Sequence, residues 1–301
     1  MNLETEISSL KLSNPFMNAS GVLSTTGGLL KRIAMAGAGA VVTKSLSLDP
    51  REGYPNPVVV ELPYGYLNAI GLANPGLESF REELREVKDV GVPVIVSVFG
   101  STVEEFARAS FKAEEIGADA IELNLSCPHA GGLTSYSQDP KLAYDVIARV
   151  KHSVSIPVFA KLSAESPSIV EVAKAVEKAG GDGVTAINTI KAMYIDVDLK
   201  RPVLSNKFGG LSGPAIKPIA VRCVYELHEA VEIPIIGVGG ISDYRDALEF
   251  ILAGASAIQV GSALAKEGFD LFRRLINGVE GYLKLHGFSS IKELIGYAHR
   301  C

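Results

Sequence analysis

Short apolar runs alternate with longer helical patterns along nearly the whole chain. Eight runs rich in Ala, Val, Ile and Phe are candidate strands: residues 16–19, 40–44, 94–98, 120–123, 158–162, 183–187, 235–238 and 257–260. The helical patterns cover residues 75–90, 102–116, 140–154, 167–179, 214–230, 243–252 and 266–286, and several begin with Pro, Asp or Thr, as helix N-termini do. This alternation predicts βα units around a parallel sheet.

A phrase of Gly and Ala recurs where a helical pattern meets the next strand, at residues 36–40, 116–120, 179–183 and 253–257. Glycine accepts the left-handed conformation that ends many helices, so these phrases predict tight turns at one common end of the sheet. Eight strands joined by such a repeated unit favour a closed (β/α)₈ TIM barrel over an open, doubly wound sheet.

The chain contains no Pro/Ser-rich linker and no low-complexity tract, so we expect a single domain over residues 1–301. Residues 4–14 are expected to form a short hairpin that closes the bottom of the barrel. The longer polar excursions at residues 45–77 and 191–212 are expected to extend the strand-end loops into a cover over the site.

Composition narrows the class of protein. The formal net charge of -5 gives no basic footprint for nucleic acid or anionic lipid. The acidic start lacks the regions of a signal peptide, and the uncharged residues 12–30 contain Ser, Thr, Asn, Pro and Gly throughout, which a membrane span would not favour. Three cysteines, Cys127, Cys223 and Cys301, form neither a disulfide framework nor a CxxC pair. We therefore expect a soluble, cytoplasmic protein.

Chemistry in such barrels comes from the carboxyl ends of the strands. Those ends form a polar ring with two lysines and hardly any carboxylate, made of Ala19, Ser20, Gly21, Lys44, Ser45, Ser97, Asn124, Lys161, Ile187, Asn188, Thr189, Gly239, Gly240, Gly261 and Ser262. Gly239-Gly240 and Gly261-Ser262 follow the last two strands, where barrels bind phosphate through backbone N–H groups. A ligand that carries phosphate is therefore favoured.

Two lysines and three amides point to a flavin and a planar substrate. Lys44 and Lys161 each end an apolar strand, where a cation would stabilise the negative charge that a flavin acquires with a hydride. Asn68, Asn124 and Asn188 offer donors and acceptors without charge, which suits a pyrimidine with alternating C=O and N–H groups. The sequence contains no HExxH, no paired His and no acidic cluster, so we expect no metal site.

Cys127 lies in a polar turn directly after the predicted strand at 120–123, together with Asn124, Pro128 and His129. Turns at strand ends carry chemistry in α/β proteins, so this thiol is a candidate base held over a ligand. The alternative is a small buried apolar residue, since free Cys is often buried. The polar neighbours favour the base.

Motifs over almost the entire chain resemble those of the dihydroorotate dehydrogenases, in the family's order. They lie at residues 18–21, 43–45, 68–76, 124–128, 210–218 and 237–240. The resemblance implies an FMN-binding barrel that oxidises dihydroorotate to orotate in de novo pyrimidine (UMP) biosynthesis. It also implies that Cys127 takes the C5 proton while the C6 hydride goes to flavin N5.

The resemblance and the strand-end positions together give the expected site. For substrate the residues are Lys44, Asn68, Ala69, Ile70, Gly71, Leu72, Asn124, Asn188 and Thr189, with the backbone of residues 69–72 receiving the carboxylate. For FMN they are Ala19, Ser20, Gly21, Lys44, Ser45, Ser97, Asn124, Lys161, Ile187, Gly213, Gly239, Gly240, Gly261 and Ser262.

Within the family, Cys rather than Ser at position 127 resembles the soluble branch. Residues 67–72 and Asn188-Thr189 are similar to the NAD-linked catalytic subunit, which pairs with a protein that carries FAD and a [2Fe–2S] cluster. Three scattered cysteines cannot supply a Cys₄ cluster site in this chain. The resemblance therefore implies an electron-transfer partner, with a homodimer core inside a heterotetramer.

Two positions depart from the family pattern and keep alternatives open. His129 replaces the usual Asn, and Cys-Pro-His resembles the pyrimidine domain of dihydropyrimidine dehydrogenases, so uracil or thymine is an alternative substrate. Ser97 stands where the NAD-linked group often has Asn near the flavin. A flavin-binding barrel without turnover is a further alternative, since one fold hosts many functions.

Overall fold

The computed structural model describes residues 1–125 and 136–300. Its centre is an eight-stranded sheet in the order β3-β16-β15-β10-β9-β8-β7-β4. The strands are β3 (Phe16–Asn18), β4 (Val41–Val42), β7 (Val94–Val98), β8 (Ala120–Asn124), β9 (Val158–Leu162), β10 (Gly183–Ala186), β15 (Ile235–Val238) and β16 (Ala257–Val260). A parallel bridge between Met17 and Ala40 joins the two ends of this order, so the sheet closes. The predicted (β/α)₈ barrel and its eight strands are confirmed.

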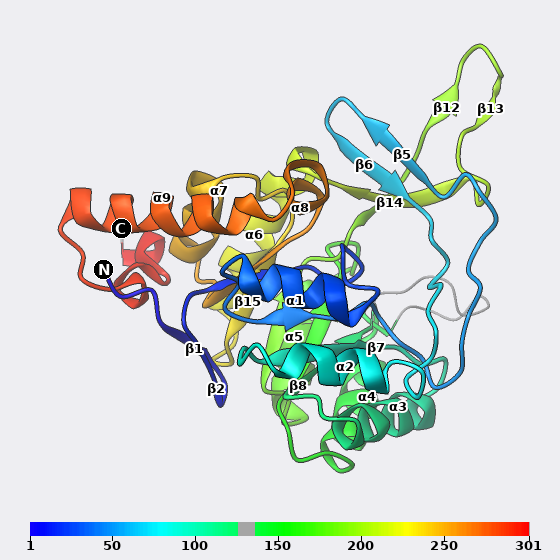
Figure 1. Cartoon of the computed structure of the whole chain (residues 1–301), viewed down its shortest axis with the longest axis horizontal. Helices are drawn as coiled ribbons and strands as arrows, with labels where there is room; N and C mark the ends of the chain where they lie inside the picture. The colour runs from blue at the N-terminus through cyan, green and yellow to red at the C-terminus, as the bar shows by residue number, and fades with distance from the viewer. Residues whose placement is uncertain (126–135, 301) are drawn as a thin grey trace.

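The strands are buried on both faces, as parallel strands between a packed interior and outer helices must be. Every residue of β7 and β9 is buried. The helices that surround the barrel are α1 (Gly27–Met35), α2 (Arg81–Lys88), α3 (Val103–Glu115), α4 (Pro140–Lys151), α5 (Ile169–Lys178), α6 (Lys217–His228), α7 (Tyr244–Leu252), α8 (Ser262–Glu267) and α9 (Asp270–His286) (Figure 1). Short 3₁₀ turns η1 (Pro214–Ile216), η2 (Ile291–Leu294) and η3 (Tyr297–Arg300) complete the helical elements of the described chain.

Two helix predictions need correction, and one helix was not predicted. The single helix expected at 266–286 is wrong, because Gly268, with φ +75°, ends α8 before α9 begins at Asp270. The helix expected from residue 75 begins only at Arg81. Helix α1 was not predicted: it opens with two glycines, which are poor helix formers, and Thr26 caps it by accepting a hydrogen bond from the Leu29 N–H.

The predicted hairpin at the barrel bottom is confirmed. Antiparallel strands β1 (Thr5–Ile7) and β2 (Leu10–Leu12) place Ile7 and Leu12 in a fully buried cluster. The cluster also contains inward-facing residues of the barrel, namely Met17, Ala40, Val42, Ile95, Ala120, Phe159, Ile236 and Ala257. The lower half of the barrel is therefore an apolar core that the hairpin closes.

The two long excursions form the predicted cover as a four-stranded antiparallel sheet, in the order β11-β14-β6-β5. Its strands are β5 (Val59–Leu62), β6 (Gly65–Asn68), β11 (Ile190–Met193) and β14 (Phe208–Ser212). The hairpin of β12 (Ile195–Asp196) and β13 (Arg201–Pro202) extends away from the rest of the molecule (Figure 1). Leu62, Leu67, Ala69 and Leu204 form a small buried core within this sheet.

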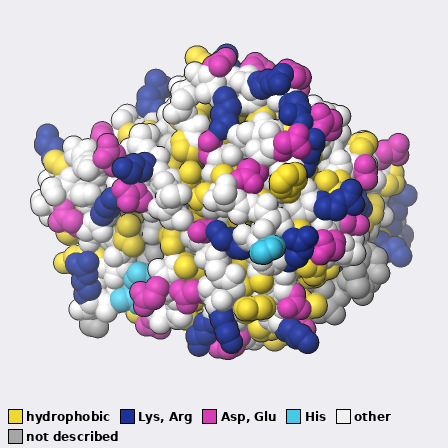
Figure 2. Space-filling view, turned by 90° about the horizontal axis from the view of Figure 1, so that it is seen from below, with side chains coloured by type: hydrophobic (Ala, Val, Ile, Leu, Met, Phe, Trp, Pro, Cys, Tyr) yellow, Lys and Arg dark blue, Asp and Glu magenta, His cyan; other side chains and the backbone are white. Residues whose placement is uncertain are grey.

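The surface carries both signs of charge side by side. On the face shown in Figure 2, Lys and Arg side chains are interspersed with Asp and Glu side chains. Across residues 1–125 and 136–300, no helix combines the length and the apolar character that a bilayer crossing needs.

Candidate active site

Five neutral side chains from five strand ends form one hydrogen-bonded chain. The Ser45 hydroxyl lies 3.2 Å from the Ser20 hydroxyl and 2.9 Å from that of Ser97. Asn124 Nδ2 donates to Ser45 Oγ at 3.2 Å, and Asn188 Nδ2 donates to Asn124 Oδ1 at 3.4 Å. The structure therefore brings these predicted site residues together at the carboxyl end of the barrel.

The cover places the third amide, Asn68, near this chain. Asn188 Oδ1 accepts from the Thr189 N–H at 2.8 Å, and Asn68 Nδ2, on β6, donates to the Gly210 carbonyl at 3.3 Å. A Cβ at Gly210 would collide with Thr189 Oγ1, so β14 must carry glycine where it passes the strand end. Asn68 and Thr189 thus approach the same place from the cover and from the barrel.

The predicted segment 69–72 is anchored to the cover at one end. The Ala69 N–H donates to the Val58 carbonyl at 2.7 Å, and the Ile70 carbonyl accepts from the Tyr54 N–H at 3.0 Å. Gly71 and Leu72 both have positive φ, at 75° and 60°. Glycine takes this conformation readily, whereas a leucine there is uncommon and is held by its surroundings.

The two lysines differ in burial. Lys44 is half-buried, and a Cβ at Gly21 would lie 3.6 Å from its Nζ, so the loop after β3 lies against the ammonium. Lys161 is 6% exposed, and its Nζ donates to Gln259 Oε1 at 3.0 Å and lies 3.4 Å from Glu122 Oε1. A buried ammonium needs such partners, because burial without them is costly.

A buried polar layer beneath the ring was missed in the sequence, where the strand ends suggested hardly any carboxylate. Glu122, Thr185 and Gln259 are fully buried. Glu122 Oε2 accepts from Gln259 Nε2 at 2.6 Å and from Thr185 Oγ1 at 3.1 Å. The alternation of strand side chains could have revealed Glu122, because it lies between inward-facing Ala120 and Asn124 on β8.

The glycines of the predicted phosphate end pack closely against one another. Gly213, Gly239 and Gly240 have φ of 104°, 137° and 74°, and a Cβ at Gly240 would lie 2.7 Å from the Gly213 carbonyl oxygen. A Cβ at Gly261 would lie 3.5 Å from Ala19 Cβ. The loop after β15 therefore packs against the end of β14, and the loop after β16 packs against the loop after β3.

Two further predicted residues lie at the same end. The Ile187 N–H donates to the Val238 carbonyl at 2.8 Å, directly after β10, and Ser262 is the first residue of α8. Cys127 and His129 lie outside the described residues, so the role of the thiol stays a prediction. Within the described ranges, no group of three His, Cys, Asp or Glu side chains could hold a metal ion.

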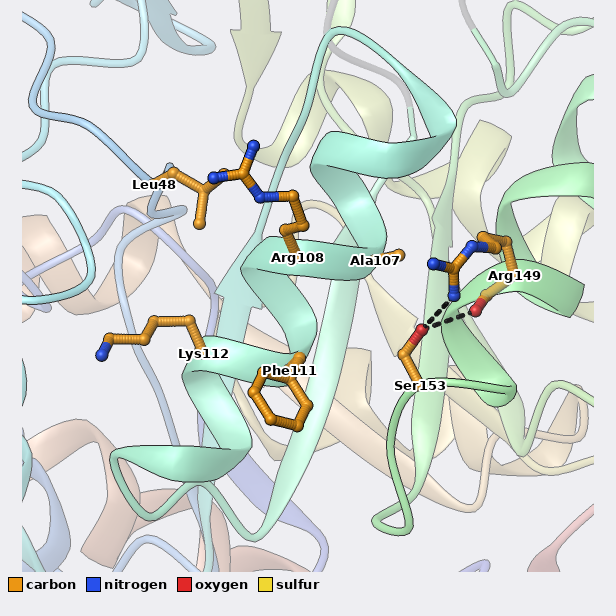
Figure 3. A pocket seen from close by; sticks show the side chains of 7 residues that line it. All are labelled: Leu48, Ala107, Arg108, Phe111, Lys112, Arg149 and Ser153. Carbon is orange, nitrogen blue, oxygen red and sulfur yellow. Dashed lines mark hydrogen bonds between the residues drawn. The ribbon is translucent and has the colours of Figure 1, made fainter.

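A separate pocket lies on the outside of the barrel, between α3 and α4 (Figure 3). Its lining is Leu48, Ala107, Arg108, Phe111, Lys112, Arg149 and Ser153. Two of its cations already have partners: Arg149 donates to Glu104 at 2.8 Å and to Ser153 Oγ at 2.6 Å, and Lys112 lies 2.6 Å from Glu78. None of the predicted site residues lines this pocket.

Comparisons with known proteins identify the family of this chain. The sequence profile described as dihydroorotate dehydrogenase matches residues 2–283. A protein of Pyrococcus abyssi named dihydroorotate dehydrogenase B (NAD(+)), catalytic subunit, is 54% identical over 299 residues, which cover 98% of this chain and 99% of that protein. Proteins of the same name from Methanothermobacter thermautotrophicus and Thermoplasma volcanium are 51% and 49% identical, each covering 99% of this chain and 98% of the relative. The chain therefore belongs to the dihydroorotate dehydrogenase family of oxidoreductases.

Proposed function

We propose that this chain oxidises dihydroorotate to orotate, a step of pyrimidine biosynthesis, as a single domain that holds FMN. The observation that carries the proposal is the continuous set of neutral amides and hydroxyls that runs from Ser20 to Thr189. Such a set suits a planar substrate with alternating donors and acceptors, because amides and hydroxyls both donate and accept hydrogen bonds.

The residues present fit FMN. Glycines with positive φ at 213, 239 and 240 keep the backbone free of Cβ atoms where the loops meet, which suits a phosphate held by backbone N–H groups. We assign the phosphate to Gly239, Gly240, Gly261 and Ser262. Lys44 and Lys161 supply positive charge at the strand ends, which would stabilise the negative charge that reduction adds to a flavin. When bound, FMN supplies the acceptor for a hydride.

For the substrate, we assign the ring edge to Asn68, Asn124, Asn188 and Thr189. Each of the three amides is half-buried at the carboxyl end of the barrel or in the cover above it. We assign the carboxylate to the backbone of residues 69–72, where positive φ at Gly71 and Leu72 turns the chain. Lys44, which directly precedes Ser45, is also assigned to the substrate, where its ammonium would meet a negative charge.

We assign the base to Cys127. Its thiolate would take the C5 proton of dihydroorotate, since the thiolate is the reactive form of cysteine and a free thiol has a pKa near 8.5. Asn124 belongs to the same strand end and to the hydrogen-bonded chain. The proposed base therefore lies three positions after Asn124, a residue that the hydrogen-bonded chain holds in place.

The electron acceptor is proposed from the relatives. They are named as catalytic subunits of an NAD(+)-linked enzyme. We propose that this chain works in the cytoplasm with a second subunit that carries FAD and a [2Fe–2S] cluster, around a homodimer core. The residues of this chain would then perform only the first half-reaction.

Anaerobic mixing of the FMN-loaded protein with dihydroorotate tests the proposal. We expect the flavin absorbance band to bleach within one turnover, with orotate as product. A second candidate, a reductase of uracil or thymine similar to the dihydropyrimidine dehydrogenases, is favoured by the sequence Cys127-Pro128-His129. Bleaching by dihydrouracil but not by dihydroorotate would select that candidate, and a protein that takes up no FMN would exclude both.

A further inference from the structure

Glu122 and Gln259 close a ring of contacts around Lys161. Glu122 Oε1 lies 3.4 Å from Lys161 Nζ, while its Oε2 accepts from Gln259 Nε2 at 2.6 Å. Gln259 Oε1 in turn accepts from Lys161 Nζ at 3.0 Å. Each of the three side chains therefore contacts the other two. Thr185 Oγ1 also donates to Glu122 Oε2, at 3.1 Å.

The contacting side chains of Glu122, Lys161 and Gln259 separate the apolar barrel bottom from the strand-end site. Glu122 pairs in register with Phe159, which belongs to the buried apolar cluster below. Lys161 pairs in register with Asn124, which belongs to the hydrogen-bonded chain above. Glu122 therefore reaches Lys161 from the closed side of the barrel, away from the amides.

Stability alone does not explain an ion pair at this depth. Taking two charges out of water is expensive, and well-packed apolar side chains of the same volume often stabilise a protein as well or better. The pair has a definite chemical effect instead: it fixes the position of Lys161 and balances its charge. An ammonium has three N–H bonds, and in the described structure Glu122 and Gln259 account for two of them.

We propose that Glu122 is the positioning residue for Lys161, holding its ammonium at the floor of the cofactor site and setting the charge that the flavin experiences. This inference rests on the proposed function, because it assigns Lys161 to FMN. It adds a residue from inside the barrel, one layer below the strand ends, and makes the electronic effect of Lys161 depend on a carboxylate.

The test is a double-mutant cycle on the FMN-loaded protein with E122Q, K161M and the double variant. E122Q keeps the shape of the side chain and removes its charge, so the ammonium acts on the flavin unbalanced. At a fixed applied potential, we expect the ratio of reduced to oxidised flavin to rise on the order of tenfold. In the K161M background, the same change at Glu122 is expected to raise that ratio less, because no ammonium is left for the carboxylate to position.

T185V is the matched control, because it removes a hydrogen bond from the same carboxylate without removing charge. We expect it to raise the ratio less than E122Q does. The inference is overturned if folded E122Q leaves the ratio unchanged, or if Glu122 shifts the ratio equally with and without Lys161. If E122Q does not fold, K161M and the double variant decide, since a rise on the order of tenfold from K161M to the double variant would refute action through Lys161.

The two proposals fail separately. Failure of the unmodified protein to bind FMN would refute the proposed function before any variant is compared. Normal FMN binding and reduction by dihydroorotate, combined with an unmoved ratio in E122Q, would refute only the role of Glu122.

Discussion

Each amide at the strand ends orients its neighbour. Asn188 accepts from the Thr189 backbone and donates to Asn124, and Asn124 donates to Ser45. Because an amide has one acceptor side and one donor side, these contacts fix which side of each group is used on its neighbours. A substitution at one position therefore changes the orientation of the next, and such effects are not additive.

Cys127→Ala tests the assigned base. Without a positioned base, we expect the rate of flavin reduction by dihydroorotate to fall by roughly 10²- to 10⁴-fold. In the unmodified protein the rate should rise with pH through the thiol pKa, because only the thiolate takes the proton. Stopped-flow absorbance under anaerobic conditions measures both.

Cys223→Ala is the matched control. Cys223 is fully buried on α6, and burial raises the pKa of its thiol, so it cannot serve as the base. Its removal should leave flavin reduction unchanged. A Cys127→Ala protein that reduces flavin at the native rate, or a native rate that is flat with pH, would contradict the assignment.

The sequence predicted some of the site residues but not the contacts between residues far apart in the chain. The ring of polar strand ends was predictable because each member follows an apolar run, and the structure joins Ser20, Ser45, Asn124 and Asn188 as expected. The alternation along β8 indicates that Glu122 faces inward, but its contact with Gln259 was not predictable, because the two lie 137 positions apart. The role of a single inward carboxylate becomes clear only when its partner is known.

At the scale of elements, helix α7 shows how one side chain can both begin a helix and attach it to its neighbour. Asp246 and Asp243 form a capping box at its start. Asp246 also lies 2.6 Å from Lys217 Nζ, at the start of α6 and beside Gly240. The sequence predicted this helix correctly, but it contained no signal for the link between α6 and α7.

Asp246→Asn should destabilise the fold by roughly 1–2 kcal/mol at neutral pH, through the weakened cap and the lost ion pair. Burial tends to raise the pKa of Asp246, but hydrogen bonds from Lys217 and Ser242 outweigh it, and the pKa lies below its ordinary value of 3.8. A depressed pKa stabilises the folded state above the unfolded value, and this contribution is lost as pH falls through the folded pKa.

The difference in unfolding free energy between Asp246→Asn and the native chain should therefore shrink between about pH 5 and about pH 2. Urea unfolding at several pH values measures it. Asp270→Asn is the matched control, since Asp270 also lies in the first turn of a helix but is exposed. A difference that stays constant with pH would show that Asp246 acts only through neutral hydrogen bonds.

Across the whole molecule, the two ends of the barrel have separate tasks. The lower end is apolar and closed by the β1–β2 hairpin, and the upper end is polar and faces the four-stranded cover. The barrel was predictable because its unit repeats along the chain. The pairing within the cover was not, because Asn68 and Gly210 meet across 142 positions of sequence, and nothing local sets that register.

The separation of the two ends predicts that the hairpin contributes stability without affecting the site. Ile7 is fully buried in the lower cluster, and Ile7→Ala should lower the unfolding free energy by about 2–4 kcal/mol, because it leaves a cavity. The affinity for FMN and the rate of flavin reduction should not change at temperatures where the variant is folded. Denaturant unfolding and flavin titration measure the two effects on the same preparation.

Ile219→Ala provides the same chemical change at an exposed position, since Ile219 is 39% exposed on α6. Its effect on unfolding should stay within about 0.5 kcal/mol. If FMN affinity in Ile7→Ala falls in parallel with stability, the lower core reaches the site through the barrel interior. The layer of Glu122, Lys161 and Gln259 would then transmit packing as well as charge, because it is the part of the interior that lies between the two ends.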